Sequence, residues 1–225
     1  MKYEIIGNPF PVLSMELNQG DAVVCQKGAM SWMSANVSMQ TSGGGLGKMF
    51  SKAISGESMF QNTYTVQNGV GKIAFGSSVP GNILAINLEG GRTIIAQKSA
   101  FLASETSVNF EMFFQKKLGA GFFGGEGFIM QKFFGNGMLF LEIDGSTVEQ
   151  ELAPGEVLQI DTGYLAAMDA TVTMSVEAVK GLGNVVLGGE GFFNTKVTGP
   201  GRIWLQTMPV STLANSISKY IPASK

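Results

Sequence analysis

The chain has 225 residues, a formal net charge of −2, one cysteine (Cys25) and no histidine. Without histidine it lacks the usual general base and the commonest metal ligand, and one cysteine excludes intramolecular disulfides and cysteine-based zinc sites. The near-neutral charge argues against binding of duplex DNA, which requires a basic surface for the phosphates.

The composition is apolar but contains no segment typical of a membrane-spanning helix. Charged residues make up 14% of the chain, against about 25% in an average soluble domain. No apolar run approaches the roughly 20 residues that such a helix needs. The N-terminal segment is interrupted at Gly7 and Pro9, too early for a signal peptide. We therefore expect a cytoplasmic protein with apolar surface that other subunits cover in part.

The sequence contains three related segments. A Leu-x-x-Gly motif begins at Leu17, Leu88 and Leu152, at intervals of 71 and 64 residues. The segments 124–128 and 188–192 both read Gly-Gly-Glu-Gly-Phe and also lie 64 residues apart. Self-similarity at a fixed spacing indicates a repeat architecture.

The motif spacing sets the boundaries of these repeats. The second and third copies stay in register from Leu88 to at least Leu141, whereas the first departs from it near the glycine-rich segment 43–56. The predicted units are 1–80, 81–145 and 146–209, followed by a tail at 210–225.

Within each repeat the pattern is that of β-strands. Residues 37–40, 108–112 and 172–177 alternate apolar and polar side chains, which is typical of strands with one buried face. Asn-Gly, Asp-Gly and Pro-Gly pairs separate the strand-like runs, as turns do. Short strands between glycine-rich turns indicate a sandwich or a barrel.

A helical pattern begins only in the tail. There Ser211 can cap a helix that carries Leu213, Ile217 and Tyr220 along one face. The sequence thus predicts an all-β fold of three tandem sandwich-like repeats with a short C-terminal helix. We expect a pseudo-threefold arrangement in which each repeat covers the open side of its neighbour.

These motifs resemble those of a bacterial and archaeal family related to the mitochondrial protein called altered inheritance of mitochondria protein 24. The features that carry the resemblance are Leu-x-x-Gly-Asp/Glu motifs at 17–23 and 152–157, the Gly-Gly-Glu-Gly-Phe segments, and the threefold duplication. The segment 56–58 departs from the pattern as Gly-Glu-Ser. The resemblance implies three short double-stranded β-helix units, similar to the subunit of the tryptophan RNA-binding attenuator protein. It implies no catalytic residues, and mitochondrial relatives are associated with inner-membrane organisation.

Two glycine-rich segments match nucleotide-binding patterns without the context that these require. Segment 119–124 reads Gly-x-Gly-x-x-Gly, but another glycine-rich turn follows where a helix should begin. Segment 43–48 is one residue too short for a phosphate-binding loop, and Met49 replaces the hydroxyl residue that would bind magnesium. We therefore expect no cofactor.

The single cysteine lies in the apolar run 22–25. A nucleophilic cysteine needs a neighbouring base or a lowered pKa, and the chain supplies no histidine. We expect Cys25 to be a buried packing residue.

One carboxylate recurs in each repeat, at Glu57, Glu126 and Glu190. The simpler interpretation is that each accepts hydrogen bonds from the main chain of its own glycine-rich turn. The alternative is that the three converge near the pseudo-threefold axis and bind a cation through their oxygens.

Adjacent phenylalanines form a second recurrent feature. Because strand side chains alternate between faces, both members of such a pair are buried only in a strand covered on two sides. The rings can pack between repeats, against another subunit, or against a membrane or protein partner. The candidate interaction surface comprises Phe122, Phe123, Phe133, Phe134, Phe192, Phe193, Leu213 and Ile217.

These features favour a non-enzymatic scaffold or interaction protein that forms homo-oligomers, with a membrane or a protein as a further partner. A binding module for a small ligand or single-stranded RNA is the alternative, although RNA binding usually joins basic residues to exposed stacking rings. A carboxylate-only enzyme such as a glycosidase is disfavoured, because the repeated glutamates show no difference that would make one an acid and another a base.

Overall fold

The computed structural model describes residues 1–42, 61–116, 127–178, 193–218 and 220–221. It is an all-β protein with a short C-terminal helix, as the sequence predicted. The chain divides into two compact units. The first contains Met1–Arg92, Ser99–Glu111 and Phe133–Glu142; the second contains Thr93–Lys98, Met112–Lys132 and Ile143–Lys225.

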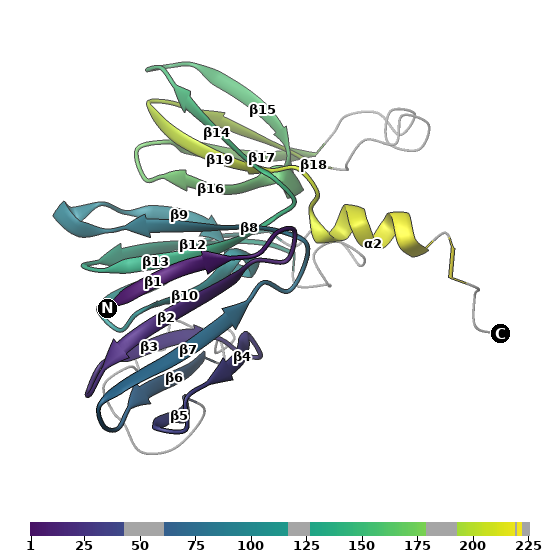
Figure 1. Cartoon of the computed structure of the whole chain (residues 1–225). Coiled ribbons are helices and arrows are strands. Elements are labelled where there is room, and N and C mark those ends of the chain that lie inside the picture. Colours follow the sequence, from purple (N-terminus) through teal and green to yellow (C-terminus); the bar gives the residue numbers. More distant parts are fainter. Residues whose placement is uncertain (43–60, 117–126, 179–192, 219, 222–225) are drawn as a thin grey trace. The chain divides into compact units, whose positions relative to one another are not determined.

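Two sheets form the first unit (Figure 1). The four-stranded sheet has the order β1 (Lys2–Ile6), β2 (Val12–Asn18), β7 (Val70–Gly76), β4 (Met30–Met33). The six-stranded sheet has the order β5 (Val37–Ser42), β6 (Gln61–Val66), β3 (Ala22–Gln26), β10 (Phe101–Glu105), β13 (Met138–Asp144), β8 (Gly81–Asn87).

A second pair of sheets lies mainly in the second unit, although residues 108–111 and 133–135 of these sheets belong to the first (Figure 1). The six-stranded sheet has the order β11 (Val108–Lys116), β12 (Phe128–Gly135), β9 (Ile94–Gln97), β16 (Leu165–Asp169), β19 (Gly201–Gln206), β14 (Thr147–Leu152). The three-stranded sheet has the order β15 (Val157–Asp161), β18 (Phe193–Thr198), β17 (Thr173–Ala178). Short 3₁₀ turns occur at Glu89–Gly91, Lys98–Ala100 and Thr162–Tyr164.

Alternation along the strands builds a separate apolar core in each unit. In β2 the buried side chains are Leu13, Met15 and Leu17, every second residue, as a strand with one covered face requires. They pack in the first core with Cys25, which confirms the predicted burial of this cysteine. The second core includes Ile203 of β19 and is built by the sheets of the second unit.

Strand pairing recurs at the intervals that the sequence repeats show. The pairing of β4 with β7 matches Trp32 with Ala74, that of β10 with β13 matches Ala103 with Phe140, and that of β16 with β19 matches Ala167 with Trp204. In all three pairs the register shifts immediately before that residue. This recurrence supports the repeat prediction, while the pseudo-threefold arrangement stays a prediction.

Strands of the middle repeat pair with strands of both other repeats. Its β10 pairs with β3 of the first repeat, and its β9 pairs with β16 of the third. Because strands of the middle repeat are distributed between the two units, the chain forms two compact units although its sequence contains three repeats. The boundaries 1–80, 81–145 and 146–209 remain a statement about sequence.

The C-terminal helix, α2, spans Val210–Ser218. Its first N–H group, at Val210, donates a hydrogen bond to the Asp144 carboxylate at 2.8 Å. Ser211 therefore lies inside the first turn, and the proposal that it caps the helix is wrong. Burial raises the pKa of the Asp144 carboxyl, an effect that the hydrogen bond from Val210 opposes.

Candidate interaction surface

Several of the predicted site residues lie outside the part of the chain that the structure describes. They are Glu57, Glu126, Glu190, Phe122, Phe123 and Phe192. Among the residues that the structure does describe, no three acidic, histidine or cysteine side chains gather closely enough to hold a metal ion. The two interpretations of the repeated glutamates both stay predictions.

Phe133 is not part of an exposed surface, so its assignment to the interaction surface is wrong. It is fully buried and stacks on Phe101, with ring centroids 5.7 Å apart and planes inclined by 13°. Phe110 completes the cluster, its ring centroid 6.0 Å from that of Phe133. The neighbouring ring of Phe134 lies on the opposite face of β12 and is half-buried.

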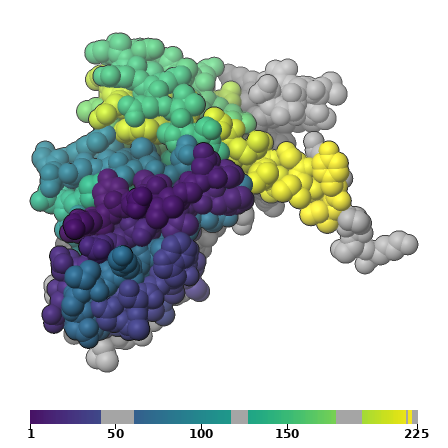
Figure 2. Space-filling view, in the orientation of Figure 1, coloured from purple at the N-terminus to yellow at the C-terminus, as the bar shows by residue number. Residues whose placement is uncertain are grey.

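The remaining predicted surface residues are only partly exposed. Phe193 is half-buried, packs against the second core, and carries the Lys116 ammonium 5.6 Å from its ring centroid. On α2, Leu213 is half-buried and Ile217 is exposed. No side chain of α2 is buried, and Figure 2 shows this helix in yellow at the molecular surface.

The strand β4 of the first unit carries exposed apolar side chains, and sequence reasoning did not single it out. Trp32 is 54% exposed and Met33 is 38% exposed. Their counterparts in the second repeat, Ala103 and Ser104 of β10, are buried. Those in the third repeat, on β16, are buried as well.

Pairing explains this difference in exposure. The strand β10 lies between β13 and β3, and β16 lies between β19 and β9. In the described part of the chain β4 pairs with β7 alone and is an edge strand of its sheet. One side of β4 therefore presents unpaired main-chain N–H and C=O groups together with the Trp32 and Met33 side chains.

A complementary edge occurs in the second unit, at β15. This strand pairs with β18 and ends its three-stranded sheet. Val157 is 48% exposed and Gln159 is exposed. The counterpart strand β9, which lies between two neighbours, is buried throughout.

Neither β4 nor β15 contains proline, although β4 is only four residues long and its pairing with β7 is irregular, two features that can protect an edge. Natural edges are blunted by charged residues, by proline or by a covering segment. The four residues of β4 are uncharged, and the single charge of β15 is Asp161 at the end of the strand. We call these two strands the β4 edge and the β15 edge, and treat them together as the candidate interaction surface.

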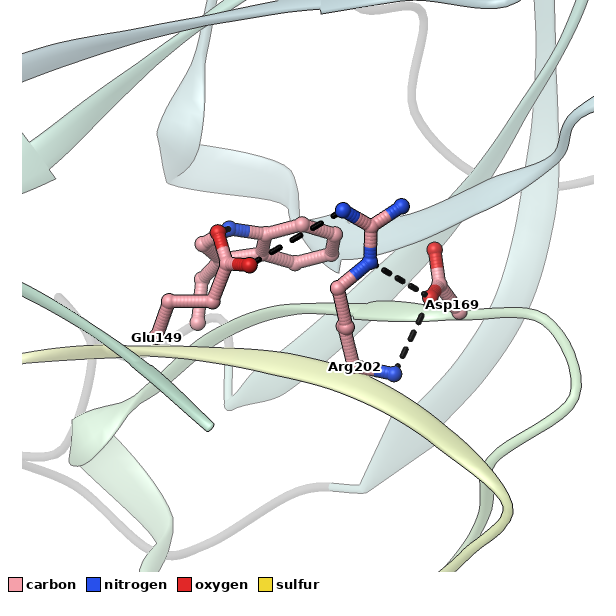
Figure 3. Close-up of polar contacts among 4 residues, drawn as sticks. Glu149, Asp169 and Arg202 are labelled. Atoms are coloured by element: carbon pink, nitrogen blue, oxygen red, sulfur yellow. Dashed lines mark hydrogen bonds and ion pairs between the residues drawn. The ribbon is translucent and has the colours of Figure 1, made fainter. Parts of the chain in front are cut away.

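A cluster of charged residues on the second unit is internally paired (Figure 3). The Arg202 guanidinium lies 3.8 Å from Glu149 and 3.5 Å from Asp169. It also lies over the ring of Trp204, whose indole N–H donates to Glu149 at 2.7 Å. Because the charges satisfy one another, this cluster holds β14, β16 and β19 together and does not offer a ready anion site.

The repeat alignment carries the signal that would have found the β4 edge. Trp32 stands where the other two repeats have alanine, at Ala103 and Ala167. A large aromatic at a position that is small in its counterparts indicates a different environment. The β15 edge has no comparable signal, because Val157 and Ile160 are ordinary strand residues.

An all-β chain built of recurring strand pairs is the class of protein that this geometry defines. The chain matches the family described as mitochondrial biogenesis AIM24 over residues 3–208. It therefore belongs to this family, which confirms the resemblance drawn from its motifs.

Two Streptococcus pyogenes proteins are similar to this chain over nearly its whole length. An uncharacterized protein of serotype M6 is 31% identical, over 96% of this chain and 88% of its own. A crystal structure of another protein from this species has a TM-score of 0.80 and 27% identity, and covers 98% of this chain and 99% of its own. In the part of this chain that the structure describes, no helix is both long and apolar enough to cross a membrane.

Proposed function

We propose that the protein is a non-enzymatic scaffold that acts by assembling into homo-oligomers. Further partners, whether a protein or a membrane surface, would bind the apolar residues that assembly leaves exposed, including those of α2. The observation that carries the proposal is the exposure of Trp32, at 54%, on a strand whose two counterparts are buried between neighbours.

The physical reason is the cost of leaving such an edge in water. A tryptophan is among the largest contributors to interface stability when it is buried, with about 150–250 Å² of aromatic surface per residue. The β4 edge adds main-chain groups that need hydrogen-bond partners, and association with another strand supplies both.

The experiment is native mass spectrometry of the full chain, purified without a denaturing step. We expect a discrete multiple of the 23.8 kDa chain mass. The double variant Trp32→Lys/Met33→Lys places two charges on the β4 edge and is expected to shift the mass to that of a monomer.

The matched control is Val70→Lys, since Val70 is also exposed but lies on β7, inside its sheet. This variant should keep the wild-type mass. A wild-type protein that stays monomeric at every concentration would overturn the proposal. A stoichiometric small-molecule adduct on a monomer would favour the alternative of a ligand-binding module.

A further inference from the structure

We infer that the β4 edge of one copy pairs with the β15 edge of a second copy, so that the subunits associate head to tail. The inference rests on the proposed self-assembly and specifies its partner, its strands and its register. Its basis is that the chain already contains this junction twice.

The two internal junctions are the pairing of β10 with β3 and the pairing of β16 with β9. The first matches Ala103 with Cys25 and Ser104 with Val24. The second matches Ala167 with Ala96 and Met168 with Ile95, which lie 64 and 71 residues further along the chain. Each junction therefore joins corresponding strands of successive repeats in one register.

The third such junction would join β4 to β15. Among the residues that the structure describes, β4 pairs only with β7 and β15 pairs only with β18. Joining the two edges would give the order β17, β18, β15, β4, β7, β2. Both six-stranded sheets consist of the corresponding strands in this same order. The joined sheet would have one strand more, because β1 pairs with β2.

The register of the third junction follows from the other two. Adding the repeat intervals places Trp32 opposite Ile160 and Met33 opposite Gln159. Ile160 belongs to the second core, as Cys25, opposite Ala103, belongs to the first. Trp32 would therefore lose its exposure by packing beside that core.

We take the partner of each edge to be a second copy of this chain, because β4 and β15 correspond to the two strands that pair in each internal junction. The β4 edge has no charge, and Asp161 lies beyond the three residues that the register pairs, so no like charges meet. Such an interface is heterologous, since every copy uses β4 on one side and β15 on the other. A single discrete mass would indicate that the subunits close into a ring, and a broad distribution an open chain.

The test is a cross-link between two single-cysteine variants in a Cys25→Ala background. Met33→Cys and Gln159→Cys are made in separate chains and mixed under mild oxidation. Directly opposite residues have Cα atoms about 4.5–5.5 Å apart, within the range of a disulfide, whereas a displacement of two residues gives about 7–8 Å. We expect a covalent dimer of twice the chain mass only from the mixture.

Two controls calibrate this result. The in-chain pair Ser104→Cys with Val24→Cys occupies the same register position in an internal junction and should form its disulfide under the same conditions. The displaced pair Met33→Cys with Val157→Cys should cross-link at least tenfold less.

The outcomes separate this inference from the proposed function. If the native mass is that of an oligomer but the mixture does not cross-link while the in-chain pair does, the head-to-tail junction is wrong and self-assembly stands. Cross-linking of Met33→Cys with itself, in the absence of the second variant, would show a symmetric contact and also overturn it. The inference would also be overturned if Met33→Cys and Gln159→Cys, combined in one chain, formed the disulfide while that chain stayed monomeric. A monomeric wild-type protein removes both proposals.

Discussion

The Asp169 carboxylate accepts a hydrogen bond at 3.0 Å from the main-chain N–H of Arg202, the second residue of β19. The same bond occurs in the other two repeats. The Met138 N–H donates to Glu105 at 2.7 Å, and the Lys72 N–H donates to Ser34 at 3.0 Å. In every repeat, therefore, a side chain at or just after the end of one strand accepts a hydrogen bond from the main chain of the strand paired with it, within the first three residues of that strand.

Removal of this acceptor should destabilise the fold. Glu105→Ala leaves the Met138 N–H without its partner, and an unpaired main-chain donor costs about 1–3 kcal/mol. We expect the free energy of unfolding in urea to fall by that amount. Glu105→Gln keeps a carbonyl oxygen at the site and should recover most of the loss; equal losses for both variants would contradict the assigned role.

Gly137, which precedes β13, should not tolerate a side chain. Gly137 has a φ of +151°, and a Cβ there would lie 2.7 Å from both the Glu105 carboxylate and the Ser107 hydroxyl. Gly90 also has a positive φ, but a Cβ there meets nothing within 4 Å. Gly137→Ala is therefore expected to lower the melting temperature more than Gly90→Ala, whose cost is conformational alone. Equal losses would show that the contact is relieved.

The phenylalanine that proved to be buried should contribute strongly to stability. Phe133→Ala removes a ring that stacks on Phe101 and packs against Phe110, and truncation of a core phenylalanine costs about 3–5 kcal/mol. Phe113, which is 44% exposed, provides the control, and Phe113→Ala should cost less than about 1 kcal/mol. Denaturant titration of both variants checks the difference; similar values would place Phe133 outside the core.

Cys25 should be unreactive in the folded protein at neutral and mildly alkaline pH. Burial raises the pKa of its thiol from 9.0 to about 12, so the folded state keeps the proton that the unfolded state releases. The contribution of the protonated thiol to the free energy of unfolding is fully present below pH 9, and it is lost as the pH rises from about 9 to about 12. A thiol reagent at pH 8 should label Cys25 only after denaturant is added, and rapid labelling of the folded protein would contradict its burial.

Local pattern predicted several of the strands and the helix, but it did not predict how strands from different repeats combine. The alternation at 37–40 and the spacing of Leu213 and Ile217 identify β5 and α2, because both signals lie within a few residues. The burial of Phe133 depends on Phe101 and Phe110, which come from other strands and pack against its ring. The same holds for the two edges, since the exposure of Trp32 depends on which strand is missing beside β4.

The central claim is that β4 and β15 complete one another between copies, and a mixing experiment tests it most directly. One variant carries Trp32→Lys/Met33→Lys and keeps its β15 edge; the other carries Val157→Lys/Gln159→Lys and keeps its β4 edge. Each should be folded by circular dichroism and monomeric when alone, because neither has a complete pair of edges.

When the two variants are mixed, the intact β15 edge of one can pair with the intact β4 edge of the other, and the complex can grow no further. Native mass spectrometry should therefore show a one-to-one heterodimer of twice the 23.8 kDa chain mass. A mixture that stays monomeric, or a variant that forms oligomers by itself, would contradict the head-to-tail assembly.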